Sequence, residues 1–140
     1  MGWAATEFET IDLGDERRNK RAIRLVERLS AQPTASVPQA CGDWADTIAA
    51  YRFFNNEAVD WRAILGAHTD CAMTRMAAHE VVLCIQDTTE LDFNGQEASG
   101  LGPLSYEAQR GMYAHPTYAV STSREPLGVL DAWMWARKAR

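Results

Sequence analysis

The chain has 140 residues, of which 46% are hydrophobic and 24% charged, and its formal net charge is −5 at pH 7. This length suits one compact domain or two very small ones, and the apolar content is sufficient for a core, which excludes a disordered chain. The longest apolar run is far too short to span a membrane, and the N-terminus lacks the basic start and apolar stretch of a secretory signal, so we expect a cytoplasmic protein with no membrane partner.

A basic cluster near the N-terminus contrasts with the acidic average. Residues 17–28 contain a single acid, Glu27. The basic residues of this segment are Arg17, Arg18, Lys20, Arg21, Arg24 and Arg28. A phosphate backbone responds to such a local patch rather than to the total charge, so the net charge does not exclude a nucleic-acid partner.

The same segment, "DLGDERRNKRAIRLVERLSAQP", predicts a helix with clear ends. Asp15 suits the N-cap, Arg28 lies near the negative C-terminal turn, and Pro33 follows the stop. At about 3.6 residues per turn, Arg17, Arg21, Arg24 and Arg28 share one face. The opposite face carries Ala22, Leu25, Val26 and Leu29. The cationic face is typical either of a solvated surface or of a DNA contact, and the pattern leaves both open.

Two further helices are predicted after a Pro- and Ser-rich connector at residues 31–42. Asp43 suits the cap of a helix over residues 44–56, and Asp60 suits the cap of another over residues 61–78. In the first of these, the residues that repeat at helical spacing and indicate an apolar face are Trp44, Ala45, Ile48, Tyr51 and Phe54. Three short helices with tight connections are typical of a DNA-reading module, although a packing unit without a ligand is the alternative.

The pattern changes to strands at Glu80. "VVLCI", residues 81–85, is apolar throughout and predicts a strand covered on both faces. "TTELDF" predicts the next strand, residues 94–111 a long loop, and residues 115–123 and 127–137 two more strands. Pro126 and Gly128 suit a turn between these last two. The fold class is therefore α+β, with an antiparallel meander after a helical first half.

Asp87 follows the apolar strand directly. A carboxylate at the end of a buried strand is costly unless it is paired, hydrogen-bonded or bound to a cation. Asp87 either accepts hydrogen bonds from Thr88 and Thr89 and shapes a turn, or is a Mg²⁺ or Mn²⁺ ligand for phosphoryl transfer. The residues alone leave both open.

Three stretches in order, "LGDERRNKRAIRL", "AAYRFFNN" and "IQDTTELDF", together resemble the N-terminal part of bacterial DDE transposases of the insertion-sequence-four type, the family of the transposon-five transposase. The later "GLGPL" and "RGMYAHPTYAV" are similar to that family's next loop and strand. The resemblance runs from about Leu13 to Arg137. It implies a helical domain at residues 1–60 that binds double-stranded transposon-end DNA. Residues 61–140 would then be the N-terminal part of a ribonuclease-H-like catalytic domain, comprising a helix and three mainly antiparallel strands.

The resemblance also assigns roles to individual residues. Arg17, Arg18 and Arg21 are expected to contact DNA, mostly at phosphates. The stripe on the same helix extends this expectation to Arg24, although Arg18 lies off the stripe. In "AYRF", we expect packing residues, with Arg52 as a DNA backbone contact.

Asp87 resembles the first acid of the DDE set, which implies a catalytic residue that binds Mg²⁺ or Mn²⁺ in a complete catalytic domain. The sequence stops at Arg140, before that family's second catalytic aspartate and its Y-R-E-K region. The 140 residues are therefore not expected to cleave DNA alone. Their strands are expected to expose an apolar face and an open edge, which favours self-association.

Three hypotheses follow for a nucleoid-associated protein. The first is a transposase segment that binds transposon ends and supplies the first metal-binding aspartate for strand cleavage and transfer. The second is a truncated DNA-binding product that competes with or inhibits full-length transposase. The third is an inactive remnant.

Overall fold

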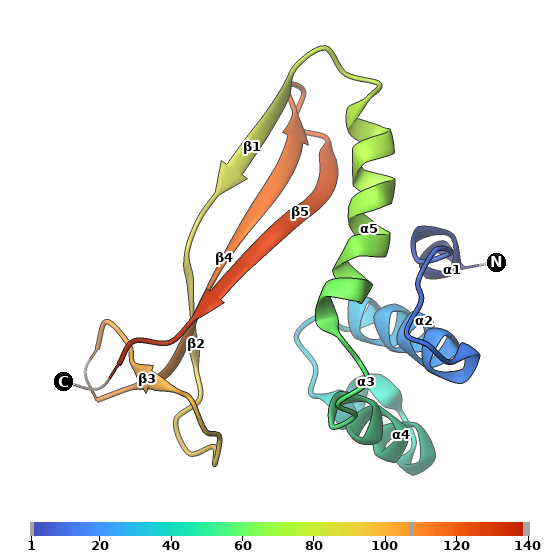
Figure 1. Ribbon diagram of the computed structural model, residues 1–140. Helices are drawn as coiled ribbons and strands as arrows, with labels where there is room; N and C mark the ends of the chain where they lie inside the picture. The colour runs from blue at the N-terminus through green and yellow to red at the C-terminus, as the bar shows by residue number, and fades with distance from the viewer. Residues whose placement is uncertain (1, 107, 139–140) are drawn as a thin grey trace. The chain divides into compact units, whose positions relative to one another are not determined.

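The computed structural model describes residues 2–106 and 108–138. Within them, five helices precede five strands, which confirms the α+β class (Figure 1). The chain forms two compact units, residues 1–71 and 72–140. The predicted division after residue 60 remains a prediction about domains. None of the helices in this described part is long and apolar enough to cross a membrane.

The helices of the first unit include all three that the sequence predicts. These are α2 (Glu16–Ala31), α4 (Trp44–Phe54) and α5 (Trp61–Met76), the last of which continues into the second unit. Two short helices were not predicted, α1 (Trp3–Glu7) and α3 (Val37–Cys41). The second lies in the supposed connector, where Ser36 and Gln39 form a capping box and Pro38 occupies the first turn, a position that tolerates proline.

The core of the first unit lies where these helices meet. Its buried side chains are Ala4, Phe8, Ile11, Leu13, Ala22, Leu25, Cys41, Ala50, Phe53 and Ala67. The apolar face that the sequence indicates for α4 is not the buried one. Trp44, Tyr51 and Phe54 are exposed by 76%, 47% and 51%, whereas α4 turns Ala50 and Phe53 into the core.

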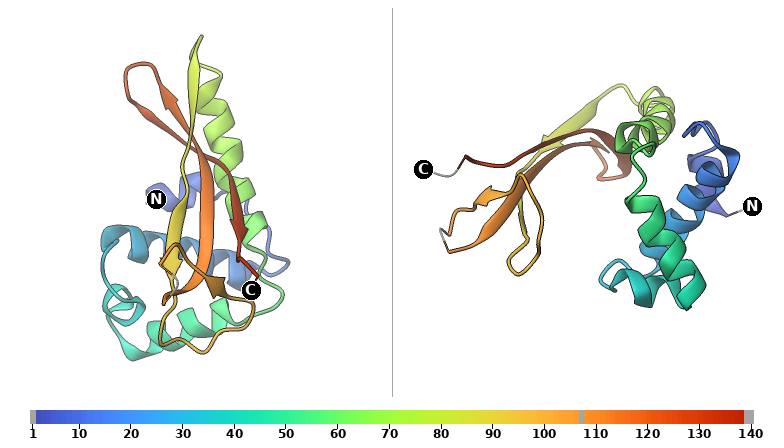
Figure 2. Two further views of the ribbon diagram at one scale, coloured as in Figure 1. Left: turned by 90° about the vertical axis from the view of Figure 1, so that its left-hand side faces the viewer. Right: turned by 60° about the horizontal axis from the view of Figure 1, so that its bottom comes forward.

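The sheet of the second unit is built around one long strand, β4 (Arg110–Ser121). It pairs antiparallel with β1 (Val82–Gln86) at residues 117–121 and with β2 (Thr89–Asp92) at residues 111–114. β5 (Pro126–Trp135) pairs with both of these stretches, so it lies along the opposite edge of β4 (Figure 2). The short β3 (Gly102–Pro103) pairs with the start of β4. The antiparallel prediction is confirmed, but a simple meander is wrong, because β1 and β2 follow one another along the same partner.

Two local predictions in this unit are also wrong. β4 starts at Arg110, inside the predicted loop, and the turn between β4 and β5 comes before Pro126. Arg124 adopts the left-handed conformation that reverses the chain, with φ of 68°, while Gly128 pairs with Ala119 inside the sheet.

The apolar strand β1 is not covered on both faces. Leu83 and Ile85 pair with Val120 and Tyr118, and their exposed fractions are 47% and 50%. Trp133 and Met134 of β5 are exposed as well. Side chains alternate between faces along a strand, so a run of apolar residues fixes the strand but not what covers it. Apolar side chains of the sheet are exposed as expected, whereas a continuous apolar face and self-association remain predictions.

Candidate nucleic-acid interface

Helix α2 carries the cationic residues, and its start is fixed by Asp15. The Asp15 carboxylate accepts a hydrogen bond from the Arg17 amide at 2.8 Å, as an N-cap does. The Arg17 guanidinium also bonds this carboxylate, with Nη2 to Oδ2 at 3.1 Å. These hydrogen bonds from Arg17 lower the pKa of Asp15 to about 2. The carboxylate therefore stays ionised at any physiological pH and favours the positive end of the helix.

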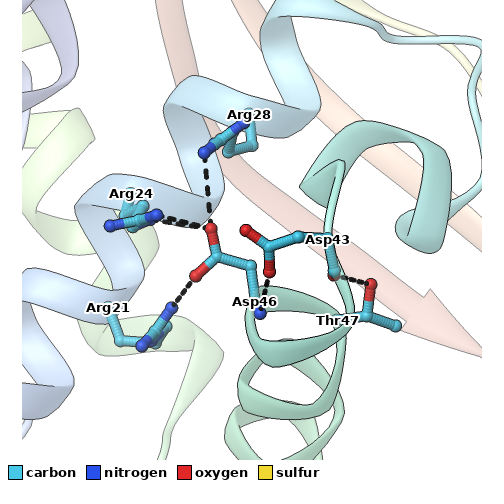
Figure 3. Close-up of polar contacts among 6 residues, drawn as sticks. All are labelled: Arg21, Arg24, Arg28, Asp43, Asp46 and Thr47. Atoms are coloured by element: carbon cyan, nitrogen blue, oxygen red, sulfur yellow. Dashed lines mark hydrogen bonds and ion pairs between the residues drawn. The ribbon is translucent and has the colours of Figure 1, made fainter.

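Three arginines of α2 converge on one carboxylate, that of Asp46 in α4 (Figure 3). Arg21 Nη1 donates to Oδ1 at 3.0 Å. On the other oxygen, Oδ2, Arg24 donates from Nε at 3.1 Å and from Nη2 at 2.5 Å, and Arg28 donates from Nη2 at 3.4 Å. One negative charge meets three positive ones, so the cluster remains cationic.

Asp46 is held in place by its own helix. It lies in the first turn of α4, where the N-cap Asp43 accepts a hydrogen bond from the Asp46 amide at 2.7 Å. Only 9% of Asp46 is exposed. The hydrogen bonds from Arg24, followed by those from Arg21, lower the pKa of Asp46 although burial acts in the opposite direction. The ion cluster thus joins α2 to α4 inside the first unit.

The other predicted DNA contacts lie in different surroundings. The Arg17 side chain is 91% exposed beside Asp15. Arg18 donates from Nη1 to the Leu13 carbonyl at 3.1 Å, which ties α2 to the segment before it. Arg52 is exposed on α4 next to the buried Phe53. The structure therefore brings Arg21 and Arg24 together, with Arg28, and leaves Arg17, Arg18 and Arg52 apart from the cluster.

Asp46 itself was not singled out from the sequence. Its signal is visible only once α4 is placed with Ala50 and Phe53 inward, because Asp46 then shares their side of the helix. The repeat of aromatic residues on α4 pointed to the opposite side.

Comparison with known protein families gives a match within the first unit. Residues 1–59 match the family model of transposase DNA-binding domains. The matched segment contains α1 to α4, and with them the whole arginine and Asp46 cluster. It supports a transposase N-terminal region whose partner is DNA.

Asp87 lies in the second unit, in the break between β1 and β2. Its Oδ1 accepts a hydrogen bond from the Thr88 amide at 2.8 Å, and Thr88 Oγ1 lies 2.7 Å from His115 Nδ1. Asp87 is exposed, so the premise that it ends a buried strand is wrong, while its role as a metal ligand remains a prediction. The turn hydrogen bond that the sequence offered as the alternative is present.

The nearby acids do not complete a metal site around Asp87. Glu90 accepts a hydrogen bond from the Ser105 amide at 2.9 Å, and Asp92 accepts one from Gln109 Nε2 at 3.0 Å. In the parts of the chain that the structure describes, no three His, Cys, Asp or Glu side chains gather as metal ligands would. These residues alone do not supply the ligand set of a divalent ion, to which Asp87 would contribute one carboxylate.

Proposed function

We propose that this chain is the N-terminal part of a cut-and-paste DNA transposase of the insertion-sequence-four type, and that its first unit binds the double-stranded ends of the transposon. The observation that carries the proposal is the match of residues 1–59 to transposase DNA-binding domains. This matched segment contains the strongly basic α2. The cationic character that DNA binding requires is thus located on one helix of the matched domain.

The chemistry of α2 suits the phosphate backbone. Guanidinium groups form charge-assisted and often bidentate hydrogen bonds with phosphates. Arg17 is almost fully exposed, and the Asp46 cluster retains more positive than negative charge. Such contacts position the protein on DNA, and contacts to base edges are needed to read the sequence of the transposon end.

The proposal includes a catalytic role for Asp87 in a ribonuclease-H-like domain. It is supported by the likeness of "IQDTTELDF" to the segment that carries the first acid of DDE transposases. Asp87 would supply one carboxylate ligand to Mg²⁺ or Mn²⁺, and only in a complete catalytic domain that provides the remaining ligands. In such a domain the ion would supply charge stabilisation for phosphoryl transfer.

DNA binding is tested by fluorescence anisotropy with two labelled duplexes of equal length. One carries the terminal sequence of the transposon that encodes this chain, and the other carries a shuffled sequence. We expect tighter binding to the terminal duplex, and a steep loss of affinity between about 50 and 200 mM NaCl. Arg17→Gln should weaken binding, while Arg62→Gln, which removes an exposed charge stacked on Trp61 of α5, is the control. Binding that is absent or insensitive to salt would exclude this function.

A DNA-binding product without catalysis is the second candidate. It is favoured by the isolated position of Asp87 among the described acids. A nicking assay on the terminal duplex with Mg²⁺ or Mn²⁺ separates the two candidates. Nicking that Asp87→Asn abolishes would assign catalysis to the chain itself, whereas tight binding without nicking would favour an occupant of transposon ends.

A further inference from the structure

A hollow of about 520 Å³ opens on the first unit beside α2. It is lined by Ala5, Lys20, Ile23, Arg24, Glu27 and Arg28. Lys20, Arg24 and Arg28 are spaced four residues apart, so they lie along one side of the helix. Of these three, only Arg24 was expected from the sequence to contact DNA. Arg17 is not among the residues that line this hollow, so the hollow is a second cationic site on α2.

Two of the cations at the hollow are anchored at a single point. Arg24 and Arg28 both donate to Oδ2 of Asp46. A guanidinium has five N–H donors in a planar fork, so each arginine keeps donors beyond those that bond Asp46. Fixing one side of a long side chain reduces the conformational entropy that is lost when the other side binds a ligand.

The third cation is free to move toward a ligand. The Lys20 ammonium lies 3.4 Å from Glu16 Oε1, and both of these side chains are more than two-thirds exposed. An exposed pair of this kind contributes little stability and is readily exchanged. Lys20 can therefore turn to a phosphate at small cost.

Glu27 is the one acid among the described residues that line the hollow, and its carboxylate lies beside Gly2. Its Oε1 occupies the position that a side chain on Gly2 would take. The hollow is lined by three cations and one carboxylate. When the paired Arg21, Asp46 and Glu16 are included, four cations still outnumber three carboxylates, so the site favours an anion.

We propose that Lys20, Arg24 and Arg28 form a seat for one phosphodiester of the bound DNA, and that Asp46 is the positioning residue that orients Arg24 and Arg28 for it. The inference rests on the proposed DNA-binding function and names the ligand group and the residues of one contact. It gives a buried acid a role in binding a polyanion, because the acid fixes two donors without neutralising them.

The sign of one substitution separates positioning from simple electrostatics. Asp46→Asn removes a negative charge from a site that binds phosphate, so electrostatics alone would strengthen DNA binding. Loss of orientation would weaken it. Weaker binding by the Asn variant is therefore a result that charge alone does not produce.

The experiment measures the affinity of the 140-residue protein for the labelled terminal duplex across about 50 to 200 mM NaCl. Lys20→Ala should lower the slope of log K against log salt by about one, as expected for one lost phosphate contact. Arg62→Gln should leave the slope unchanged. Asp46→Asn should weaken binding, and Arg24→Gln should cost less in the Asp46→Asn background than in the wild type, because the two residues act through one contact.

Two results would overturn the inference: a Lys20→Ala slope equal to that of the wild type, or Asp46→Asn binding that is as tight as wild type or tighter. Lys20 is exposed and does not contact Asp46, so its variant decides the matter even if Asp46→Asn unfolds. Failure of the wild type to bind either duplex would instead refute the proposed function itself.

Discussion

Arg24 donates two hydrogen bonds to the same oxygen of Asp46, from Nε at 3.1 Å and from Nη2 at 2.5 Å. The bonds join α2 to α4, so the residue that the sequence marks as a DNA contact also holds two helices together. Binding and stability are coupled at this position. A loss of DNA affinity in an Arg24 variant must therefore be compared with its melting temperature before it is assigned to a lost phosphate contact.

The acid stability of the first unit should depend on Asp15 and Asp46. Both carboxyls have a lowered folded pKa, and that of Asp15 falls from 3.8 to about 2 through its hydrogen bonds with Arg17. A lowered folded pKa contributes stability that is fully present above the unfolded value and is lost as the pH falls through the folded value. We expect the melting temperature to fall steeply from about pH 4 to pH 2, measured by circular dichroism.

Variants at the two positions isolate these contributions from those of the other acids. Asp15→Asn and Asp46→Asn should each melt at a lower temperature than the wild type near neutral pH and lose less stability on acidification. If a variant retains the full pH dependence of the wild-type melting temperature, the carboxyl that it lacks does not contribute to the acid sensitivity.

Two glycine-to-alanine substitutions should change the free energy of unfolding in opposite directions. Gly42 ends α3 with a φ of 83°, a conformation that alanine adopts only with strain. Gly66 lies inside α5, and a methyl group there would meet no atom within 4 Å. We expect Gly42→Ala to destabilise by about 1 kcal/mol and Gly66→Ala to stabilise by about 0.5–1 kcal/mol, measured by urea unfolding. Equal effects would contradict the assigned conformation of Gly42.

The helix boundaries could be predicted because they depend on local chemistry. Asp15 and Asp43 cap the helices that follow them, through hydrogen bonds that span two or three residues. The orientation of α4 could not be predicted, because the partner helix decides which side is buried. Aromatic residues repeat along α4 at helical spacing, but the buried residues of this helix include the small Ala50.

The candidate interface was predictable in part for the same reason. The arginine stripe follows from helical spacing within α2, whereas Asp46 lies 22 residues beyond Arg24 and meets it only in the folded unit. In the sheet, the position of β1 follows from its composition. Its pairing with β4, across a long loop, and the exposure of its side chains depend on tertiary structure.

The exposure of β1 can be tested by comparing the unfolding free energies of two leucine-to-alanine variants in the second unit. Leu127 is 2% exposed, whereas Leu83 of β1 is 47% exposed. Leu127→Ala should lower the free energy of unfolding by about 2–5 kcal/mol, because it removes buried methyl groups and leaves a cavity. Leu83→Ala should cost less than about 1 kcal/mol. If the two costs in urea unfolding are alike, β1 is covered in solution, by a second copy of the chain or by another part of it. Dependence of the Leu83→Ala cost on protein concentration would identify the second copy.

Asp87→Asn should leave the fold intact, because the asparagine carbonyl oxygen can accept the same hydrogen bond from the Thr88 amide. The side chain is exposed, so the free energy of unfolding should change by less than about 0.5 kcal/mol. Affinity for the terminal duplex should also be unchanged, since the matched DNA-binding segment ends at residue 59. Thr88→Val is the control for the turn: it retains the backbone amide but removes the hydroxyl that meets His115. If Asp87→Asn unfolds the second unit, Asp87 has a structural role in the turn. Its assignment as a catalytic acid would then lose its support. A stable variant that binds DNA normally is the one in which a loss of metal-dependent cleavage can be attributed to the carboxylate itself.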